Sequence, residues 1–406
     1  MFRERILNSV SYSSGNVSVV DLPRDAVYHM IQLSVYGGTW VSVQGAMGTG
    51  PTLDDNFPFS LMRQIRLIRN GSDVVFQGSG AQLAKEHYYL NKSAPFARLY
   101  TVSANVETLR TATVRGITVP ANADGINACG GGFTVANAPA SSTTLYFDME
   151  VELWLQMGPE DAYYGTILDA RELASFQLEI TWATSAQISV AGTANTSDTI
   201  TASFSITSID QDNLEIGQPL GTFKRSGLSF TNIPYASNNY QVLLPRGNFY
   251  HGIIFQTRAQ KAASTTVLFA ENNVISSAIN RINSNFQLRN FNFPALQSKN
   301  MSDGGGRPQA FSTAQGMPQG WAYLYYPSAA NEGNELIPTY VMDQFDFQIT
   351  TAALGSSQNG VTTASTNPTI DLLLEEVIPG QDIGSSAPRG AKAGSIGKTT
   401  AKPYQR

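Results

Sequence analysis

Two segments of the chain, 145–155 and 176–182, alternate apolar and polar residues. Their apolar members are Phe147, Met149, Val151, Leu153 and Leu155 in the first and Phe176, Leu178, Ile180 and Trp182 in the second. Because neighbouring side chains point to opposite faces of a strand, each segment predicts a β-strand with one buried face. Single-sided apolar stripes of this kind are typical of two sheets packed face to face.

The second half of the chain repeats the order of elements in the first half. In the first half, the order is a strand at 145–155, a short helical turn at 168–174, strand 176–182, a Gly/Ser/Thr/Asn-rich loop and strand 200–209. In the second half, the matching segments are 321–326, 336–342, 344–349, a similar loop and 369–378. We interpret this order as two β-units of one plan, with loop insertions between preserved strands.

Upstream segments fit the same repeat. Residues 28–35 correspond to 249–255, and a helical stretch near 79–92 corresponds to one expected near 274–288. The second helix is predicted from Ile275, Ile279, Ile282 and Phe286, which recur at spacings of four, three and four. Asn70-Gly71 predicts a two-residue hairpin turn, because both central positions of a type I′ turn need positive φ.

The fold class predicted from these patterns is all-β: two eight-stranded antiparallel jelly rolls in tandem, with short helices in inter-strand loops. A pair of immunoglobulin-like sandwiches is the alternative architecture. The predicted parts are an N-terminal arm at 1–27, a first jelly roll at 28–213 with a large loop at 93–144, a linker at 214–221, a second jelly roll at 222–380 and a flexible basic C-terminal tail at 381–406.

Charge is scarce and unevenly distributed. Charged residues form 14% of the chain, below the roughly 25% usual in soluble domains, so lateral packing between molecules would desolvate few charges. The net charge of −5 argues against nucleic-acid wrapping by the body of the protein. No acidic residue follows Asp382, whereas the tail carries Arg389, Lys392, Lys398, Lys402 and Arg406. The tail is either a solvated terminus or an arm that contacts an acidic surface or a neighbouring subunit.

Cys129 is the single cysteine, which excludes an intrachain disulfide and a thiolate metal cluster, and we assign it no role. The lack of disulfides fits synthesis in a reducing cytoplasm. The first residues contain no apolar stretch long enough for a signal peptide, and no apolar run of about 18 residues predicts a transmembrane helix.

Candidate chemistry is sparse. Asp148, Glu150 and Glu152 share one strand face, which suggests either a weak Ca²⁺ site, a glycosidase-type acid pair or simply a solvated or inter-subunit polar face. The three histidines, His29, His87 and His251, are far apart in sequence, and the repeat alone explains why His29 matches His251. No nucleophile elbow, phosphate loop or zinc-protease motif occurs, so we predict no catalytic residue, no cofactor and no enzyme activity.

One resemblance adds to this interpretation. Residues 65–75, with the helical segment 80–90 behind them and the run 148–180, resemble the double jelly-roll major capsid proteins of tailless icosahedral viruses. That lineage includes internal-membrane bacteriophages and the adenovirus hexon, and the similarity of element order covers most of 15–380. It implies a homotrimer whose six jelly rolls form a pseudo-hexagonal capsomer of an icosahedral virion.

The same resemblance implies the partners of the chain. They would be two further copies of itself, neighbouring capsomers, penton or minor capsid proteins, and an internal membrane or the genome through the basic tail. The alternative function is a two-domain β-sandwich that acts as a glycan-binding adhesin or a glycan-cleaving virion component.

Overall fold

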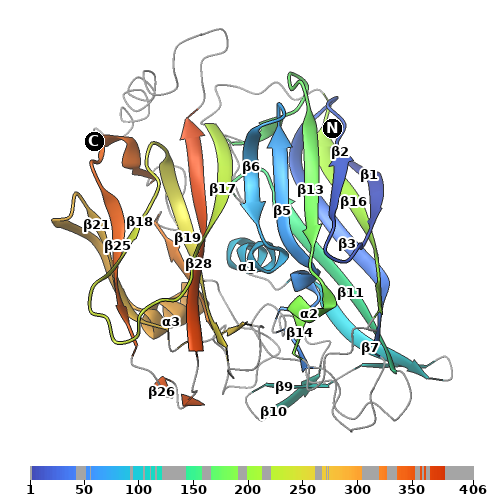
Figure 1. The fold of residues 1–406 in the computed structure, drawn as a ribbon. Helices are drawn as coiled ribbons and strands as arrows, with labels where there is room; N and C mark the ends of the chain where they lie inside the picture. Colours follow the sequence, from blue (N-terminus) through green and yellow to red (C-terminus); the bar gives the residue numbers. More distant parts are fainter. Residues whose placement is uncertain are drawn as a thin grey trace.

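The structure is a computed structural model of the 406-residue chain. It describes residues 2–42, 52–54, 56–91, 95–103, 106–109, 111–114, 117–120, 143–157, 166–190, 199–212, 221–260, 268–270, 272, 274–303, 320–326, 336–352, 357–358, 361–362 and 366–379. The architecture is almost entirely β, in two units that stand side by side (Figure 1).

The first unit is built from two sheets. One sheet has the order β1 (Phe2–Ser11), β16 (Ser203–Gln211), β3 (Val27–Ser42), β11 (Thr143–Trp154), β7 (Ala97–Ser103) and β8 (Val106–Leu109); β12 (Leu168–Asp169) and β15 (Thr199–Thr201) also pair with β3. The facing sheet has the order β2 (Val17–Asp21), β13 (Phe176–Trp182), β5 (Met62–Arg69) and β6 (Asp73–Gly78). The apolar faces of both sheets form one buried core.

The second unit repeats this plan. One sheet has the order β17 (Gly221–Phe230), β28 (Thr366–Pro379), β19 (Phe249–Gln260) and β20 (Phe269–Ala270); β23 (Trp321–Tyr325) and β24 (Ile337–Pro338) also pair with β19. The facing sheet has the order β18 (Tyr240–Leu243), β25 (Phe345–Thr351), β21 (Ile275–Ile282) and β22 (Phe286–Asn292). A separate apolar cluster fills the space between them.

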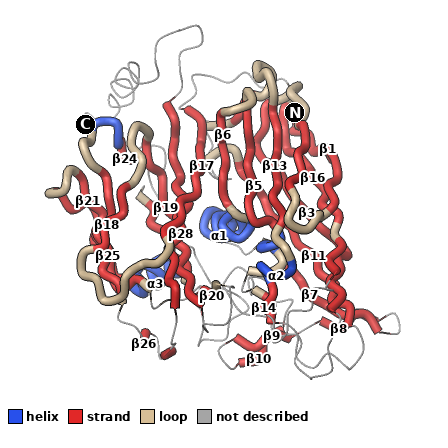
Figure 2. The backbone as a smooth tube through the Cα atoms, in the orientation of Figure 1, coloured by secondary structure: helices blue, strands red, loops and turns tan. Residues whose placement is uncertain are grey.

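Short elements complete the described chain. The helices are α1 (Gly80–Asn91), α2 (Ser185–Ile188) and α3 (Phe293–Asp303), with 3-10 turns η1 (Phe59–Leu61) and η2 (Thr339–Val341). Three small ladders pair β4 (Thr52–Leu53) with β14 (Ser189–Val190), β9 (Thr111–Val114) with β10 (Ile117–Pro120), and β26 (Ser357–Gln358) with β27 (Val361–Thr362). Strands therefore dominate both units, as the tube in Figure 2 shows.

The alternating stripes are confirmed. Every apolar residue predicted to share a face of 145–155 or 176–182 is buried, and β11 and β13 belong to opposite sheets of the first unit. The positive φ values expected at Asn70 and Gly71 are confirmed, at 51° and 75°, but the expected two-residue turn is wrong: Arg69 pairs with Asp73, so residues 70–72 form the loop that joins β5 to β6. Alternation thus identified the strands that carry the core.

The helix predicted near 274–288 is wrong. This segment is the hairpin of β21 and β22, and the helix of the second unit, α3, follows it. Ile275, Ile279 and Ile282 are β-branched and fit a strand, while Asn283 and Ser284 adopt the positive φ values, 50° and 62°, of the turn. The turn expected at 168–174 begins with the short strand β12 and continues as turn residues, with no helix.

The N-terminal arm predicted at 1–27 is also wrong. β1 pairs antiparallel with β16 and β2 pairs antiparallel with β13, so the segment supplies the edge strand of each sheet of the first unit. The linker predicted at 214–221 lies outside the described residues except for Gly221, which begins β17. Residues 121–142 of the large loop, with Cys129, and the tail at 381–406 lie outside them as well.

Candidate functional site

The two units meet through a continuous sheet. β6 of the first unit pairs in parallel with β17 of the second, where Arg225 is opposite Phe76 and Ser226 is opposite Gln77. This pairing joins strands of both units into one sheet, and α1 lies beneath it between the units (Figure 1). This parallel pairing fixes the direction and register of β17 relative to β6, so the two units are joined through one continuous sheet.

A buried ion pair stabilises this junction. Arg225 Nη1 donates to Glu86 Oε1 at 2.9 Å, and both side chains are buried. The Arg225 guanidinium also lies 5.0 Å from the ring centroid of Phe76 and 4.7 Å from that of Phe223. Burial raises the pKa of Glu86 to about 7, although the charge of Arg225 opposes this shift. Each charge depends on its partner from the other unit, because an unpaired buried charge is strongly destabilising.

Aromatic residues and a second carboxylate extend the junction. Tyr89 on α1 stacks on Tyr323 with ring centroids 5.2 Å apart. Tyr323 Oη donates to Glu375 Oε2 at 2.6 Å, and His251 Nδ1 lies 2.8 Å from the same oxygen. Burial, followed by the charge of Glu375, raises the pKa of Tyr323 well above its usual value. Tyr323 therefore stays a neutral donor that connects α1 with the core of the second unit.

A repeated corner shows that the two units correspond residue by residue. The sequence Leu-Pro-Arg-x-x-x-Tyr-His occurs at 22–29 and again at 244–251. Tyr28 Oη donates to the carbonyl of Pro23 at 2.7 Å, and Tyr250 Oη donates to that of Pro245 at 2.8 Å. Only the matching histidines of this segment were recognised as equivalent from the sequence; the eight-residue repeat is the further signal that identifies both corners.

The arginines of the two corners are also equivalent. Arg24 Nη1 donates to the carbonyl oxygens of Leu173 and Ala174, just before β13. Arg246 Nη1 donates to those of Met342 and Asp343, just before β25. The first corner therefore links the start of β3 to the turn before β13, and the second links the start of β19 to the turn before β25.

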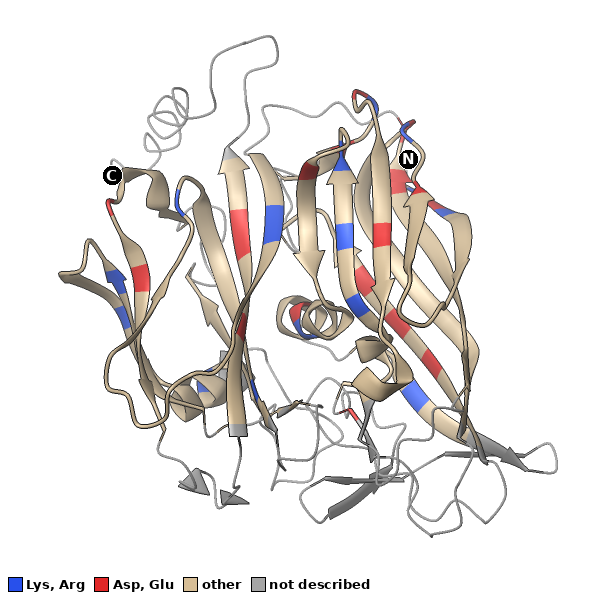
Figure 3. Cartoon of the chain, in the orientation of Figure 1, with Lys and Arg blue, Asp and Glu red and all other residues tan. Residues whose placement is uncertain are grey.

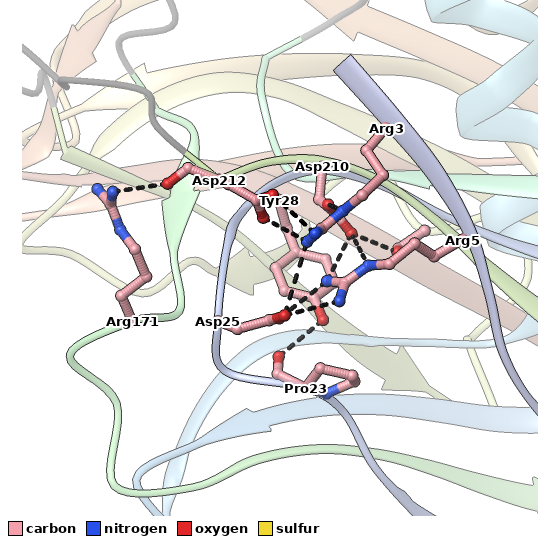
Figure 4. A network of polar contacts seen from close by, with 9 residues as sticks. Arg3, Arg5, Pro23, Asp25, Tyr28, Arg171, Asp210 and Asp212 are labelled. Carbon is pink, nitrogen blue, oxygen red and sulfur yellow. Dashed lines mark hydrogen bonds and ion pairs between the residues drawn. The ribbon is translucent and has the colours of Figure 1, made fainter. Parts of the chain in front are cut away.

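An ion network fixes β1 to the rest of the first unit (Figure 4). Arg3 Nε and Arg5 Nε each donate to Asp210 at 2.8 Å, and Arg5 also forms two hydrogen bonds of 2.9 Å with Asp25. The side-chain hydrogen bonds from Arg5 lower the pKa of Asp25, although partial burial opposes them. Asp212 accepts a further bond from Arg3. These long-range contacts explain why the N-terminal segment is a strand.

No family model matches this sequence, and no curated protein matches it. Solved structures do. The major capsid protein of Sulfolobus turreted icosahedral virus has a TM-score of 0.59 at 15% identity, covering 95% of this chain and 100% of that chain. The Faustovirus major capsid protein has a TM-score of 0.52 at 9% identity, covering 93% of this chain and 89% of that chain.

This chain has the double jelly-roll fold. At these identities the likeness concerns the architecture, and it extends over nearly the whole chain. It confirms the two jelly rolls predicted from the strand pattern in preference to a pair of immunoglobulin-like sandwiches. The junction described above is thus the contact between the two jelly rolls of one chain.

The three carboxylates of β11 have separate partners in the first jelly roll. Asp148 accepts hydrogen bonds from Arg98 and from the backbone amide of Gly37 and is buried. Glu150 accepts a hydrogen bond from Tyr36, and Glu152 accepts hydrogen bonds from Asn91 and Trp154. Of the alternatives open for these carboxylates, the solvated face is therefore wrong for Asp148, which is buried and paired with Arg98. These contacts do not favour the glycan-cleaving alternative.

Within the described ranges, no group of three or more His, Cys, Asp or Glu side chains is arranged to hold a metal ion. In the same part of the chain, no helix has both the length and the apolar character needed to cross a bilayer. The basic residues of the tail, predicted as contacts, lie outside what the structure describes.

Proposed function

We propose that the chain is the major capsid protein of an icosahedral virus and that it acts as a structural protein of the virion. The observation that carries this proposal is the parallel junction of β6 and β17, which holds two jelly rolls of one plan side by side in a single chain. The fold likeness to major capsid proteins over nearly the whole chain supports it.

The capsomer that we propose is a homotrimer. Three copies of a chain with two like units present six like units around one axis, so a three-fold oligomer imitates a hexagon and packs against neighbours through nearly equivalent contacts. Many such contacts act together in a shell, and each one alone can be weak. The buried ion pair of Arg225 and Glu86 supports this role because it fixes the relative position of the two units.

The distribution of charge supports lateral packing. Much of the described ribbon carries no charged residue, as Figure 3 shows, and several of the charges that it does carry are paired within the chain. Capsomer contacts therefore desolvate few unpaired charges, which is the main penalty of a polar interface.

Further partners follow from the capsid role. The proposed capsomer contacts other capsomers and the penton or minor capsid proteins that complete a shell. The basic tail, with its five cations after Asp382, is proposed to contact an internal membrane or the genome on the inner side.

Light scattering coupled to size-exclusion chromatography tests the proposal. The purified chain should elute as a species of three times 43.8 kDa, and negative-stain images of assembled material should show hexagonal tiles or closed shells. A stable monomer that forms no particles under any assembly condition would overturn the proposal.

A further inference from the structure

The hairpin of β5 and β6 corresponds residue by residue to the hairpin of β21 and β22. Both turns contain an asparagine with positive φ, Asn70 at 51° and Asn283 at 50°. Both ladders skip one residue of the second strand, Val75 in the first unit and Leu288 in the second. This shared bulge fixes the alignment, so that Phe76 of β6 is equivalent to Arg289 of β22 and Gln77 is equivalent to Asn290.

β1 and β17 are equivalent in the same way. Each is the neighbour of the last strand of its unit, β16 and β28, and each of those pairs in turn with β3 or β19. The ladders of β3 and β19 skip His29 and His251, respectively, which sets one register for both units. In this register, Arg225 of β17 is equivalent to Glu4 of β1, and Ser226 is equivalent to Arg5.

β22 and β1, the equivalents of β6 and β17, are edge strands that have a neighbour on one side only in the described part of the chain. Within one chain, β6 pairs with β17, whereas β22 and β1 end their sheets at opposite ends of the described molecule. Both edges expose large apolar side chains, Ile6 at 80% and Phe286 at 62%. An exposed edge strand with apolar side chains is a template for pairing with another chain.

We propose that β22 of one copy pairs in parallel with β1 of the next copy, so that the contact between chains repeats the junction within each chain. This inference rests on the proposed capsomer and names its internal interface. The contact is head-to-tail, and such contacts generate a closed ring when the rotation between copies closes. If β22 and β1 pair in the same register as β6 and β17, Glu4 lies opposite Arg289 of the next copy, and Arg5 lies opposite Asn290.

Charge supports this pairing, with the signs exchanged. Within the chain, Arg225 on β17 pairs with Glu86 on α1. α1 and α3 begin directly after their equivalent strands, and the alignment of the hairpins carries on into the helices, which makes Lys299 on α3 equivalent to Glu86. Between chains, Glu4 would therefore meet Lys299 as well as Arg289, and all three side chains are exposed in the single chain. The strand carries the base and the helix the acid within the chain, whereas the strand would carry the acid and the helix the base between chains, so the charges are complementary in both contacts.

Charge reversal tests the contact in the full chain. Glu4→Arg should weaken the trimer, because like charges would face each other. The protein concentration below which the trimer dissociates should rise by about tenfold or more. Adding Arg289→Glu and Lys299→Glu to that variant should restore the trimer. Glu172→Arg and Arg63→Glu, at exposed positions on other parts of the first unit, are the matched controls and should leave the trimer unchanged.

A disulfide tests the register. Neighbouring strands lie about 4.8 Å apart, within the Cα separation that a disulfide spans. In a Cys129→Ser background, Glu4→Cys combined with Arg289→Cys should give covalent dimers and trimers on mild oxidation. The control combines Glu4→Cys with Leu243→Cys, because Leu243 is 63% exposed on β18, the opposite edge of the same sheet as β22. This control should stay monomeric on a denaturing gel.

The outcomes separate this inference from the proposed function. A trimer that dissociates no more readily with Glu4→Arg, or that cross-links through Leu243 and not through Arg289, would overturn the edge pairing and leave the capsid role intact. Absence of any trimer from the unmodified chain would overturn both.

Discussion

The hydroxyl of Tyr250 donates a hydrogen bond to the carbonyl oxygen of Pro245 at 2.8 Å, five residues earlier in the chain. Tyr28 and Pro23 form the same bond at 2.7 Å. Each tyrosine also makes an edge-to-face contact with the first residue of the facing strand, Phe345 or Phe176. One device therefore sets the entry to the central strand in both jelly rolls, which is direct evidence at the residue level that the units share one plan.

Removing either hydroxyl should have the same effect. Tyr28→Phe and Tyr250→Phe each leave a proline carbonyl without its donor while the ring packing stays, so each should lower the free energy of unfolding by about 1 kcal/mol. Denaturant titration of the purified protein measures this loss. Tyr36→Phe is the control, because Tyr36 is 64% exposed and its bond to Glu150 lies at the surface. A loss in one unit only would contradict the equivalence of the two corners.

The ion pair at the junction should be sensitive to the loss of one partner. Arg225→Met leaves the buried Glu86 without its cation, so that its carboxyl is either an unpaired charge or takes up a proton, and the variant should be destabilised by up to about 3–5 kcal/mol. Glu86→Gln added to Arg225→Met should recover most of that loss, because it replaces the unpartnered carboxyl with a neutral amide. Thermal or denaturant unfolding of the unmodified chain, both single variants and the double variant measures the coupling. Equal stability of Arg225→Met and the unmodified chain would show that the pair does not stabilise the junction.

Acid should destabilise the first jelly roll through His87. Burial lowers the pKa of His87 from 6.5 to about 4. The unfolded chain takes up a proton near pH 6.5 and the folded chain does so only near pH 4. The stability contributed by neutral His87 is therefore present above pH 6.5 and is lost as the pH falls from 6.5 to about 4. His87→Gln should flatten the decline of the melting temperature between pH 7 and pH 4.

His29 provides a comparison for this measurement. Burial lowers the pKa of His29 as well, so His29→Gln should flatten the same decline and the double variant should flatten it further. A decline of unchanged slope in the double variant would indicate that other groups control the acid response.

Local pattern predicted the elements whose own side chains form the core. The strands at 145–155 and 176–182 could be predicted from alternation alone, because consecutive residues of a strand alternate between its buried and its exposed face. Residues 275–288 carry an ambiguous pattern, since isoleucines at spacings of four and three also suit a helix, and only β-branching and the Asn283 turn favour a hairpin.

Long-range contacts were beyond local pattern. Residues 2–11 belong to the segment 1–27 that the sequence predicts as an arm, yet they form a strand, and Asp210, more than 200 residues away, pairs with both Arg3 and Arg5. A solvated face was one of the alternatives for Asp148, yet Asp148 is buried, and Arg98 from a neighbouring strand pairs with it. The partners of these charges come from distant segments, so no window of sequence contains the information.

Deleting residues 384–406 should separate folding from assembly. These residues contain five cations and no acid, and both apolar cores are formed by residues that precede them, so the shortened chain should still form a trimer with an unchanged melting temperature. Shell formation, followed by negative-stain microscopy, should be impaired because the cations would no longer contact an acidic surface. Replacing the five cations with Gln is the control for chain length and should impair assembly similarly. Unfolding of the shortened trimer, or normal shells from both variants, would contradict the role of the tail.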